Sequence, residues 1–167
     1  EKAAVLRDQI AAVRALAEEQ KVVDFQEEAR DYVGWFRAQG EVRLVVLAKR
    51  GGHLVGRESF LLGNAGRDED FLPEFLGQYY GGRDSLPRTV YLPPVSGLPA
   101  LQEFLRSLTG SSLQLRLPRK GKHARMLAMA LEAARFRLEG EQERRSRSVA
   151  ALQEALGLPQ PPRHIEG

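Results

Sequence analysis

The amino-acid sequence predicts an α/β protein built on a five-stranded mixed sheet with helices on its faces. Two observations lead to this class. The hydrophobic residues recur every three to four positions, as in an amphipathic helix, then every second position, as in a half-buried strand, and then every three to four again. Glycines and prolines divide these stretches into short elements. The expected order is a helix, then βββαβαβα, then one further helix.

The first expected element is an amphipathic helix over about residues 1 to 20, since neither glycine nor proline occurs before residue 34. A lone helix cannot bury an apolar stripe, so this one needs a partner. The partner is a preceding helix, another protein or the domain that follows. The stripe consists of Ala3, Leu6, Ile10, Val13 and Leu16 or Ala17.

Three strands are expected next, joined as an antiparallel meander. The breaks between them are Gln39-Gly40 and Gly51-Gly52, which suit tight hairpins because glycine accepts a positive φ. Alternating apolar residues mark the strands: Val33 and Trp35, then Val42, Leu44 and Val46, then Leu54, Phe60 and Leu62.

Two helices and two short strands are expected to alternate after the meander. Asp68 is the expected cap of a helix that Gly81-Gly82 ends, and Ser96 the expected cap of a helix that Gly110 ends. Strands are expected at 89–92 and 113–117. The first of these helices presents Phe71, Leu72, Phe75, Leu76, Tyr79 and Tyr80 inward, and the second Leu98, Leu101, Phe104, Leu105 and Leu108.

A long helix should begin at Lys122 and loosen near Gly140. A separate last helix is expected around 149–156, and a proline-containing linker after it. The inward side of the long helix is expected to carry Leu127, Ala130, Leu131, Ala134 and Leu138. A meander followed by two α-linked strands is the order of elements in ribonuclease H-like folds. The expected divisions are an N-terminal helix over 1–21, a ribonuclease H-like domain over 22–147, and a helix with a linker over 148–167.

Ribonuclease H-like nucleases hold two metal ions about 4 Å apart with carboxylates. The ligands belong mid-way on the first strand, near the first helix, at the end of the fourth strand and on the last helix. Here only Asp31 stands at the edge of the first strand, the fourth ends Tyr91-Leu92-Pro93-Pro94, and the last helix opens Lys122-His123-Ala124-Arg125. We therefore expect a catalytically inactive domain with no metal and no cofactor. The alternative is a metal-dependent nuclease that uses Asp31, Asp70 and another acid.

Composition excludes several other kinds of site. The chain has no cysteine, and its three histidines, His53, His123 and His164, have no ligand spacing. No apolar run approaches the ~18 residues of a membrane span, and the first residues have no signal-peptide pattern. These features favour a cytoplasmic protein without a membrane partner. The absence of an initiating methionine suggests a piece of a longer chain.

The positive charge is concentrated late in the chain. Residues 113–147 carry 10 basic and 4 acidic side chains, whereas residues 1–112 carry 14 and 16. Two clusters form this excess, one at an expected strand-to-helix turn and one at Arg144-Arg145-Ser146-Arg147. The turn is either a weak, non-specific contact for DNA backbone or a solvated surface. Its cations are Arg116, Arg119, Lys120, Lys122 and Arg125.

Several strings resemble one family, UvrC of bacterial nucleotide excision repair. Residues 1–10, EKAAVLRDQI, resemble the second half of the UVR motif, the helical hairpin through which UvrC engages UvrB. The strings RGGHLVG at 50–56, FLGQYY at 75–80 and LPRKGK at 117–122 resemble the central region of UvrC. The match keeps its order along nearly the whole chain.

The resemblance implies a repair excinuclease whose cutting and main DNA-binding domains lie outside this chain. It implies that this region engages UvrB and positions the other domains of the same protein. The implied UvrB contacts are Ala3, Leu6, Arg7, Asp8, Ile10 and Val13. The chain departs from the family pattern in lacking the first half of the UVR hairpin and any cysteine cluster.

Overall fold

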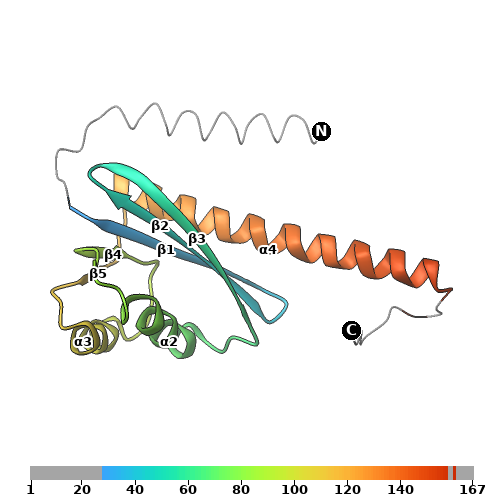
Figure 1. Cartoon of the computed structure of the whole chain (residues 1–167), viewed down its shortest axis with the longest axis horizontal. Coiled ribbons are helices and arrows are strands. Elements are labelled where there is room, and N and C mark those ends of the chain that lie inside the picture. The colour runs from blue at the N-terminus through green and yellow to red at the C-terminus, as the bar shows by residue number, and fades with distance from the viewer. Residues whose placement is uncertain (1–27, 158–159, 161–167) are drawn as a thin grey trace.

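The structure is a computed structural model, and it describes residues 28–157 and residue 160 (Figure 1). Five strands and three helices make up this part of the chain. In chain order they are β1 (Arg30–Ala38), β2 (Glu41–Arg50), β3 (His53–Gly63), α2 (Asp68–Tyr80), β4 (Thr89–Tyr91), α3 (Leu98–Thr109), β5 (Gln114–Arg116) and α4 (Lys122–Ala155).

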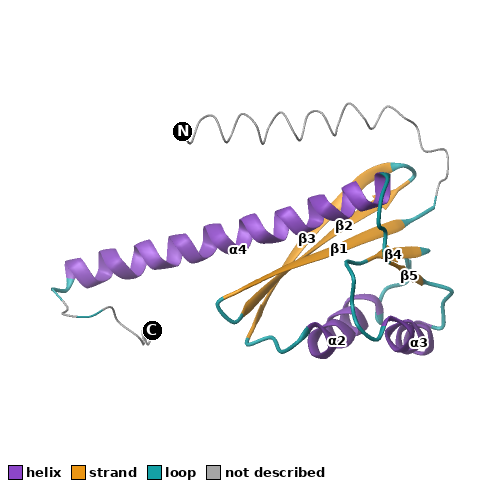
Figure 2. Cartoon of the chain, turned by 180° about the vertical axis from the view of Figure 1, so that it is seen from behind, coloured by secondary structure: helices purple, strands orange, loops and turns teal. Residues whose placement is uncertain are grey.

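The five strands form one mixed sheet in the order β3-β2-β1-β4-β5. β1, β2 and β3 pair antiparallel, whereas β4 pairs parallel with both β1 and β5. Figure 2 shows α4 on one face of this sheet and α2 with α3 on the other. The predicted α/β class and the ribonuclease H-like order of elements are confirmed.

The two hairpins of the meander lie at the predicted glycines. Gln39 and Gly40 have φ of 51° and 78°, and Gly51 and Gly52 have φ of 54° and 79°. Two consecutive residues with positive φ match the type of tight turn whose twist suits the flanking strands. The turn at Gln39-Gly40 keeps Arg37 of β1 paired with Val42 of β2, so this turn sets the register between the two strands.

The core between the sheet and α2 and α3 is the larger of the two. It contains Val33, Val42, Leu44 and Val46 from the meander, and Leu101 and Leu105 from α3. Trp35 packs at its margin, with its ring edge-on to Phe71 at 6.0 Å. All six predicted inward residues of α2 are buried: Phe71, Leu72, Phe75, Leu76, Tyr79 and Tyr80.

The second core lies between α4 and the other face of the sheet. α4 buries Leu127, Ala130, Ala134 and Leu138, as predicted. The first three belong to this core, and Leu131 packs against it partly buried. The helix lies very close to β1 at Gly34. A Cβ atom there would stand 2.6 Å from the backbone nitrogen of Leu131 and 2.7 Å from the carbonyl carbon of Ala130. Only glycine leaves room for this contact.

Three sequence-based expectations about the helices are wrong. α4 is continuous from Lys122 to Ala155, so the expected separate helix at 149–156 is its last part. Gly140 does not break it, because one glycine costs a helix only about 1 kcal/mol and Glu143 pairs with Arg147 one turn apart at 2.9 Å. The helix caps differ as well: Arg67, not Asp68, precedes α2, and Gly97, not Ser96, precedes α3.

The expected inward face of α3 is also only partly correct. Leu101 and Leu105 are buried, but Phe104 and Leu108 are 41% and 46% exposed. They lie over Gly77 and Gly81 of α2, which places them at the rim of the core. Among the described residues, no helix carries a stretch apolar enough to cross a membrane.

Candidate nucleic-acid interface

Aromatic side chains stand near three of the places where a ribonuclease H-like nuclease would hold metal. Tyr32 of β1 is the register partner of Tyr91 at the end of β4, and their rings stack at 5.0 Å. His123, in the first turn of α4, stacks on Tyr91 at 4.4 Å. The Tyr32 hydroxyl and His123 Nδ1 are 2.9 Å apart. These three side chains link β1, β4 and α4 by packing.

The acid nearest to those places, Asp31, points to the other face of β1. Its side chain is 1% exposed and accepts a hydrogen bond from Arg50 Nη1 at 2.7 Å. Its second oxygen accepts a hydrogen bond from the Tyr80 hydroxyl at 3.0 Å. Burial and the Asp31 carboxylate together raise the pKa of Tyr80 well above its ordinary value. Asp31 therefore ties β1 to β2 and α2.

Asp31 and Asp70 do not meet, although the alternative nuclease hypothesis pairs them. Asp31 contacts Tyr80 in the last turn of α2, whereas Asp70 lies ten residues earlier in the same helix, or about 15 Å along its axis. The Asp70 carboxylate accepts a hydrogen bond from the backbone of Arg67, which satisfies an amide at the helix start. Within the described residues, no three His, Cys, Asp or Glu side chains gather where a metal could bind.

A second polar network joins the edge strand to α2. The Tyr79 hydroxyl donates to Glu58 of β3 at 2.5 Å, and Arg83 pairs with the same carboxylate at 3.1 Å. The Arg83 guanidinium lies over the Tyr79 ring at 3.9 Å. The hydrogen bond from Tyr79 holds the pKa of Glu58 below its ordinary value, against the opposing effect of burial, and Arg83 lowers it further. Burial raises the pKa of Tyr79.

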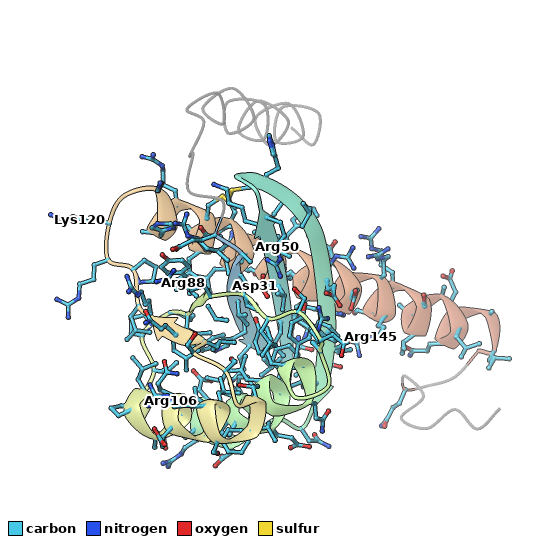
Figure 3. The ribbon with its side chains drawn as sticks, turned by 60° about the vertical axis from the view of Figure 1, so that its left-hand side comes forward. Asp31, Arg50, Arg88, Arg106, Lys120 and Arg145 are labelled. Atoms are coloured by element: carbon cyan, nitrogen blue, oxygen red, sulfur yellow. The ribbon has the colours of Figure 1, made fainter. Side chains whose placement is uncertain are left out.

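The predicted cations come together at the turn between β5 and α4, which we call the basic turn (residues 116–125). Figure 3 shows Lys120 projecting away from the body of the domain. Arg116 pairs with no acid in the described part of the chain, and its guanidinium donates instead to the side-chain oxygen of Gln114 at 2.8 Å. All five predicted side chains are exposed: Arg116, Arg119, Lys120, Lys122 and Arg125.

Sequence reasoning missed some residues around the basic turn. Arg88, just before β4, is 65% exposed and pairs with Glu28 at 2.9 Å. Tyr32 and Tyr91, which the sequence does not mark as site residues, hold the first turn of α4 against the sheet. The alternation of β1 could have placed Tyr32. Val33 and Trp35 face the core on the side of α2 and α3, so Tyr32, next to Val33, must face α4. For Arg88, no local pattern in the sequence signals its place.

The second cluster of arginines lies on α4, and one of its members has a structural role. Arg145 of α4 pairs with Glu41 at the β1–β2 turn at 2.5 Å, and Gln142 donates to the Ala38 carbonyl at 3.2 Å. Arg43 of β2 pairs with Glu141. The hydrogen bond from Arg145 holds the pKa of Glu41 below its ordinary value. Arg145 is thus the member of this cluster that fastens α4 to the sheet, whereas Arg144 and Arg147 bond to Gly140 and Glu143 within α4.

The profile of the family described as UvrC ribonuclease H-like domain matches residues 29–141. The chain belongs to this family.

The relatives of this UvrC domain are bacterial proteins named UvrABC system protein C. UvrABC system protein C of Clostridium beijerinckii is 32% identical over 175 residues, which cover 99% of this chain and 28% of that protein. The protein of the same name from Thermus thermophilus is 35% identical, over 100% of this chain and 30% of its own length. The chain thus spans less than a third of these relatives. A solved Bacteroides thetaiotaomicron protein with an actin-like ATPase fold overlaps 68% of this chain and 42% of its own, at 11% identity and a TM-score of 0.42, too low to bear on function.

The residues expected to contact UvrB lie outside the described part of this UvrC domain. Ala3, Leu6, Arg7, Asp8, Ile10 and Val13 all precede residue 28. Their assignment stays a prediction. The site that the structure describes is therefore the basic turn and its support by the two tyrosines and His123.

Proposed function

We propose that this UvrC ribonuclease H-like domain is a non-cutting scaffold of the cytoplasmic UvrABC repair nuclease. In this role it holds the backbone of DNA weakly through the basic turn. It also positions UvrB, through the N-terminal helix, and the cutting domains of the same full-length protein relative to that DNA. The nuclease activity itself belongs to parts of the full-length protein outside this chain.

The observation that supports a non-cutting role is the chemistry of the nuclease positions. Phosphodiester hydrolysis by two metal ions needs several carboxylates that reach a shared, accessible point. Tyr32, Tyr91 and His123 occupy that region with an aromatic stack. Asp31 is directed to the opposite face and neutralised there by Arg50.

The observation that supports backbone binding is the exposure of the cations at the turn. Arg119 and Lys120 lie in the loop before α4, and Lys122 is the first residue of that helix. Basic side chains at such a place attract phosphates without reading the bases. Exposed aromatic rings that would stack on bases are absent from the described basic turn, because Tyr32 and Tyr91 are only 1% and 6% exposed.

One experiment on the 167-residue chain tests both parts of this role. Nicked and bubble-containing DNA are incubated with it and Mg²⁺ or Mn²⁺, and binding is measured as a function of salt. We expect binding without cleavage, and a variant with Arg119→Gln, Lys120→Gln and Lys122→Gln should bind with a slope of log K against log salt that is smaller by about 0.9 per lost phosphate contact. Cleavage that disappears in Asp31→Asn would establish the nuclease alternative. An unchanged slope would make the turn a solvated surface.

Engagement of UvrB is tested separately, in the full-length protein. The stripe that includes Leu6, Ile10 and Val13 would pack on a helix of UvrB, with Arg7 and Asp8 setting the polar register. Leu6→Asp combined with Ile10→Asp places two charges on that stripe and should abolish capture of UvrB. A matched variant changes Ala11 and Ala15, which would lie on the opposite side of the expected helix, to Asp. UvrB capture that survives the first variant overturns the assignment.

A further inference from the structure

The basic turn continues across the sheet as a wider basic band. We propose that this band, made of Arg116, Arg119, Lys120, Lys122 and Arg125 with Lys49 and Arg57, binds the backbone of double-stranded DNA over about five to six base pairs. This inference rests on the proposed function, because it extends the same binding site from α4 to the edge strand.

The register of the sheet places the two ends of the band in one row. Arg57 of β3 pairs with Leu47, Leu47 pairs with Tyr32, Tyr32 with Tyr91 and Tyr91 with Arg116. Residues directly opposite one another in a sheet point to the same face. Leu47, Tyr32 and Tyr91 pack against α4, so Arg57 and Arg116 stand on that face, at either side of the helix start.

The space between the two arginines is filled by the first turn of α4. His123 packs on Tyr32 and Tyr91 in the middle of the row. Lys122 and Arg125, from the same turn, are exposed above it. Lys49, two residues beyond Leu47 on β2, faces the same side one step along the sheet.

Two acids of the meander point away from this band. Asp31 and Glu58 face the other side of the sheet, where they bond to Tyr80 and Tyr79. Glu28 lies near the band, but Arg30 and Arg88 share it at 3.5 Å and 2.9 Å. Arg57 is exposed and makes no ion pair with any described residue. Arg57 and Arg116, at the two ends of the band, therefore each bring a positive charge that no described acid pairs with.

The length of the band indicates the class of DNA. Neighbouring strands lie about 4.8 Å apart, so the four steps from Arg57 to Arg116 span about 19 Å. Duplex DNA advances about 3.4 Å per base pair, and this span corresponds to about five to six base pairs. The band is a rigid row without exposed rings for base stacking, which favours a stiff duplex over a single strand.

The test compares Arg57→Gln with a matched arginine on the opposite side of the domain. Arg106 of α3 is exposed, pairs with Glu103 within its own helix and lies far from Lys120 in Figure 3. Binding of each full-chain variant to a duplex of about 16 base pairs, roughly three times the span of the band, is measured at several salt concentrations. We expect Arg57→Gln to reduce the slope of log K against log salt by about 0.9, and Arg106→Gln to leave it unchanged.

The outcomes separate this inference from the proposed function. If Arg57→Gln has no effect while the variant of Arg119, Lys120 and Lys122 lowers the slope, the band is wrong and binding by the turn stands. If neither changes the slope, both fall. Tighter binding to a single strand of the same sequence than to the duplex would overturn the choice of double-stranded DNA. Circular dichroism confirms that Arg57→Gln, an exposed change, leaves the fold intact.

Discussion

At the scale of single residues, Asp31 and Tyr32 are neighbours in the chain but face opposite sides of the sheet. Asp31 is 1% exposed and bonded to Arg50 and Tyr80. Tyr32 is equally buried and lies against Tyr91 and His123. Adjacent positions of β1 therefore carry a buried ion pair and an aromatic stack. Because of this alternation, the side chain that faces the start of α4 is aromatic and not acidic.

The Asp31 network should contribute strongly to stability. Removing one member of a buried ion pair typically costs about 3 to 5 kcal/mol, and a hydrogen bond to a charged group about 1.5 to 3 kcal/mol. We expect Asp31→Ala to lower the free energy of unfolding by about 3 kcal/mol, and Tyr80→Phe by less, about 2 kcal/mol. Urea denaturation of both, with the exposed change Asp84→Ala as control, measures this. Equal stability of Asp31→Ala and the unchanged protein would contradict the structural role.

The carboxyl group of Glu58 should make the stability of the domain depend on pH in the acidic range. Its pKa lies below the ordinary 4.5 in the folded state, because Tyr79 and Arg83 bond to its ionised form. A lowered carboxyl pKa adds stability above the unfolded pKa, and this stability is lost as the pH falls through the folded pKa. The difference in unfolding free energy between neutral pH and pH below 4.5 should be smaller for Glu58→Gln than for the unchanged protein. Glu132→Gln, on the exposed side of α4, is the control, and an identical decrease in all three proteins would count against this assignment.

At the scale of elements, the contact between α4 and β1 depends on the missing side chain of Gly34. A Cβ atom would meet the backbone of Ala130 and Leu131, which cannot move without shifting the helix. Because Tyr32 and His123 lie on the same two elements, such a shift would also move the basic turn.

Gly34→Ala should therefore destabilise the domain by about 1 to 3 kcal/mol, the usual cost of overpacking. Gly63→Ala is a matched control in β3, since nothing lies within 4 Å of its Cβ position. Thermal unfolding of both proteins checks the difference. A Gly34→Ala protein as stable as Gly63→Ala would mean that α4 moves away freely.

The elements themselves were largely predictable, because their signals are local. Gln39-Gly40 and Gly51-Gly52 located the two hairpins, and the apolar spacing of α2 identified its whole buried face. The continuity of α4 was not predictable from Gly140, since ion pairs one turn apart and the bond between Arg145 and Glu41 compensate for it. The cations of the basic turn were found from composition. The partners of Asp31 were not, because Arg50 and Tyr80 meet it only through the packing of β2 and α2.

At the scale of the whole molecule, the two sides of the sheet differ in what they offer to a partner. The side that carries α4 has the basic turn at one end, and the side of α2 and α3 has acids in the first turn of α2. Arg145 and Gln142 mark the far end of the contact between α4 and the sheet. Figure 1 shows that the helix then runs on well past the meander.

The part of α4 beyond this contact, which we call the overhang (residues 146–155), sets both the direction and the distance at which the chain leaves the domain. Residues 146–155 extend α4 by about 15 Å beyond its contact with Glu41, without a break. In a helix each residue turns the chain by about 100°, so deleting one residue from the overhang would swing whatever follows to a different side of the domain. Deleting seven residues would restore the original orientation of the following segment to within about 20°, but would place that segment about 10 Å closer to the sheet. Changes in the length of the overhang can therefore alter orientation and reach separately.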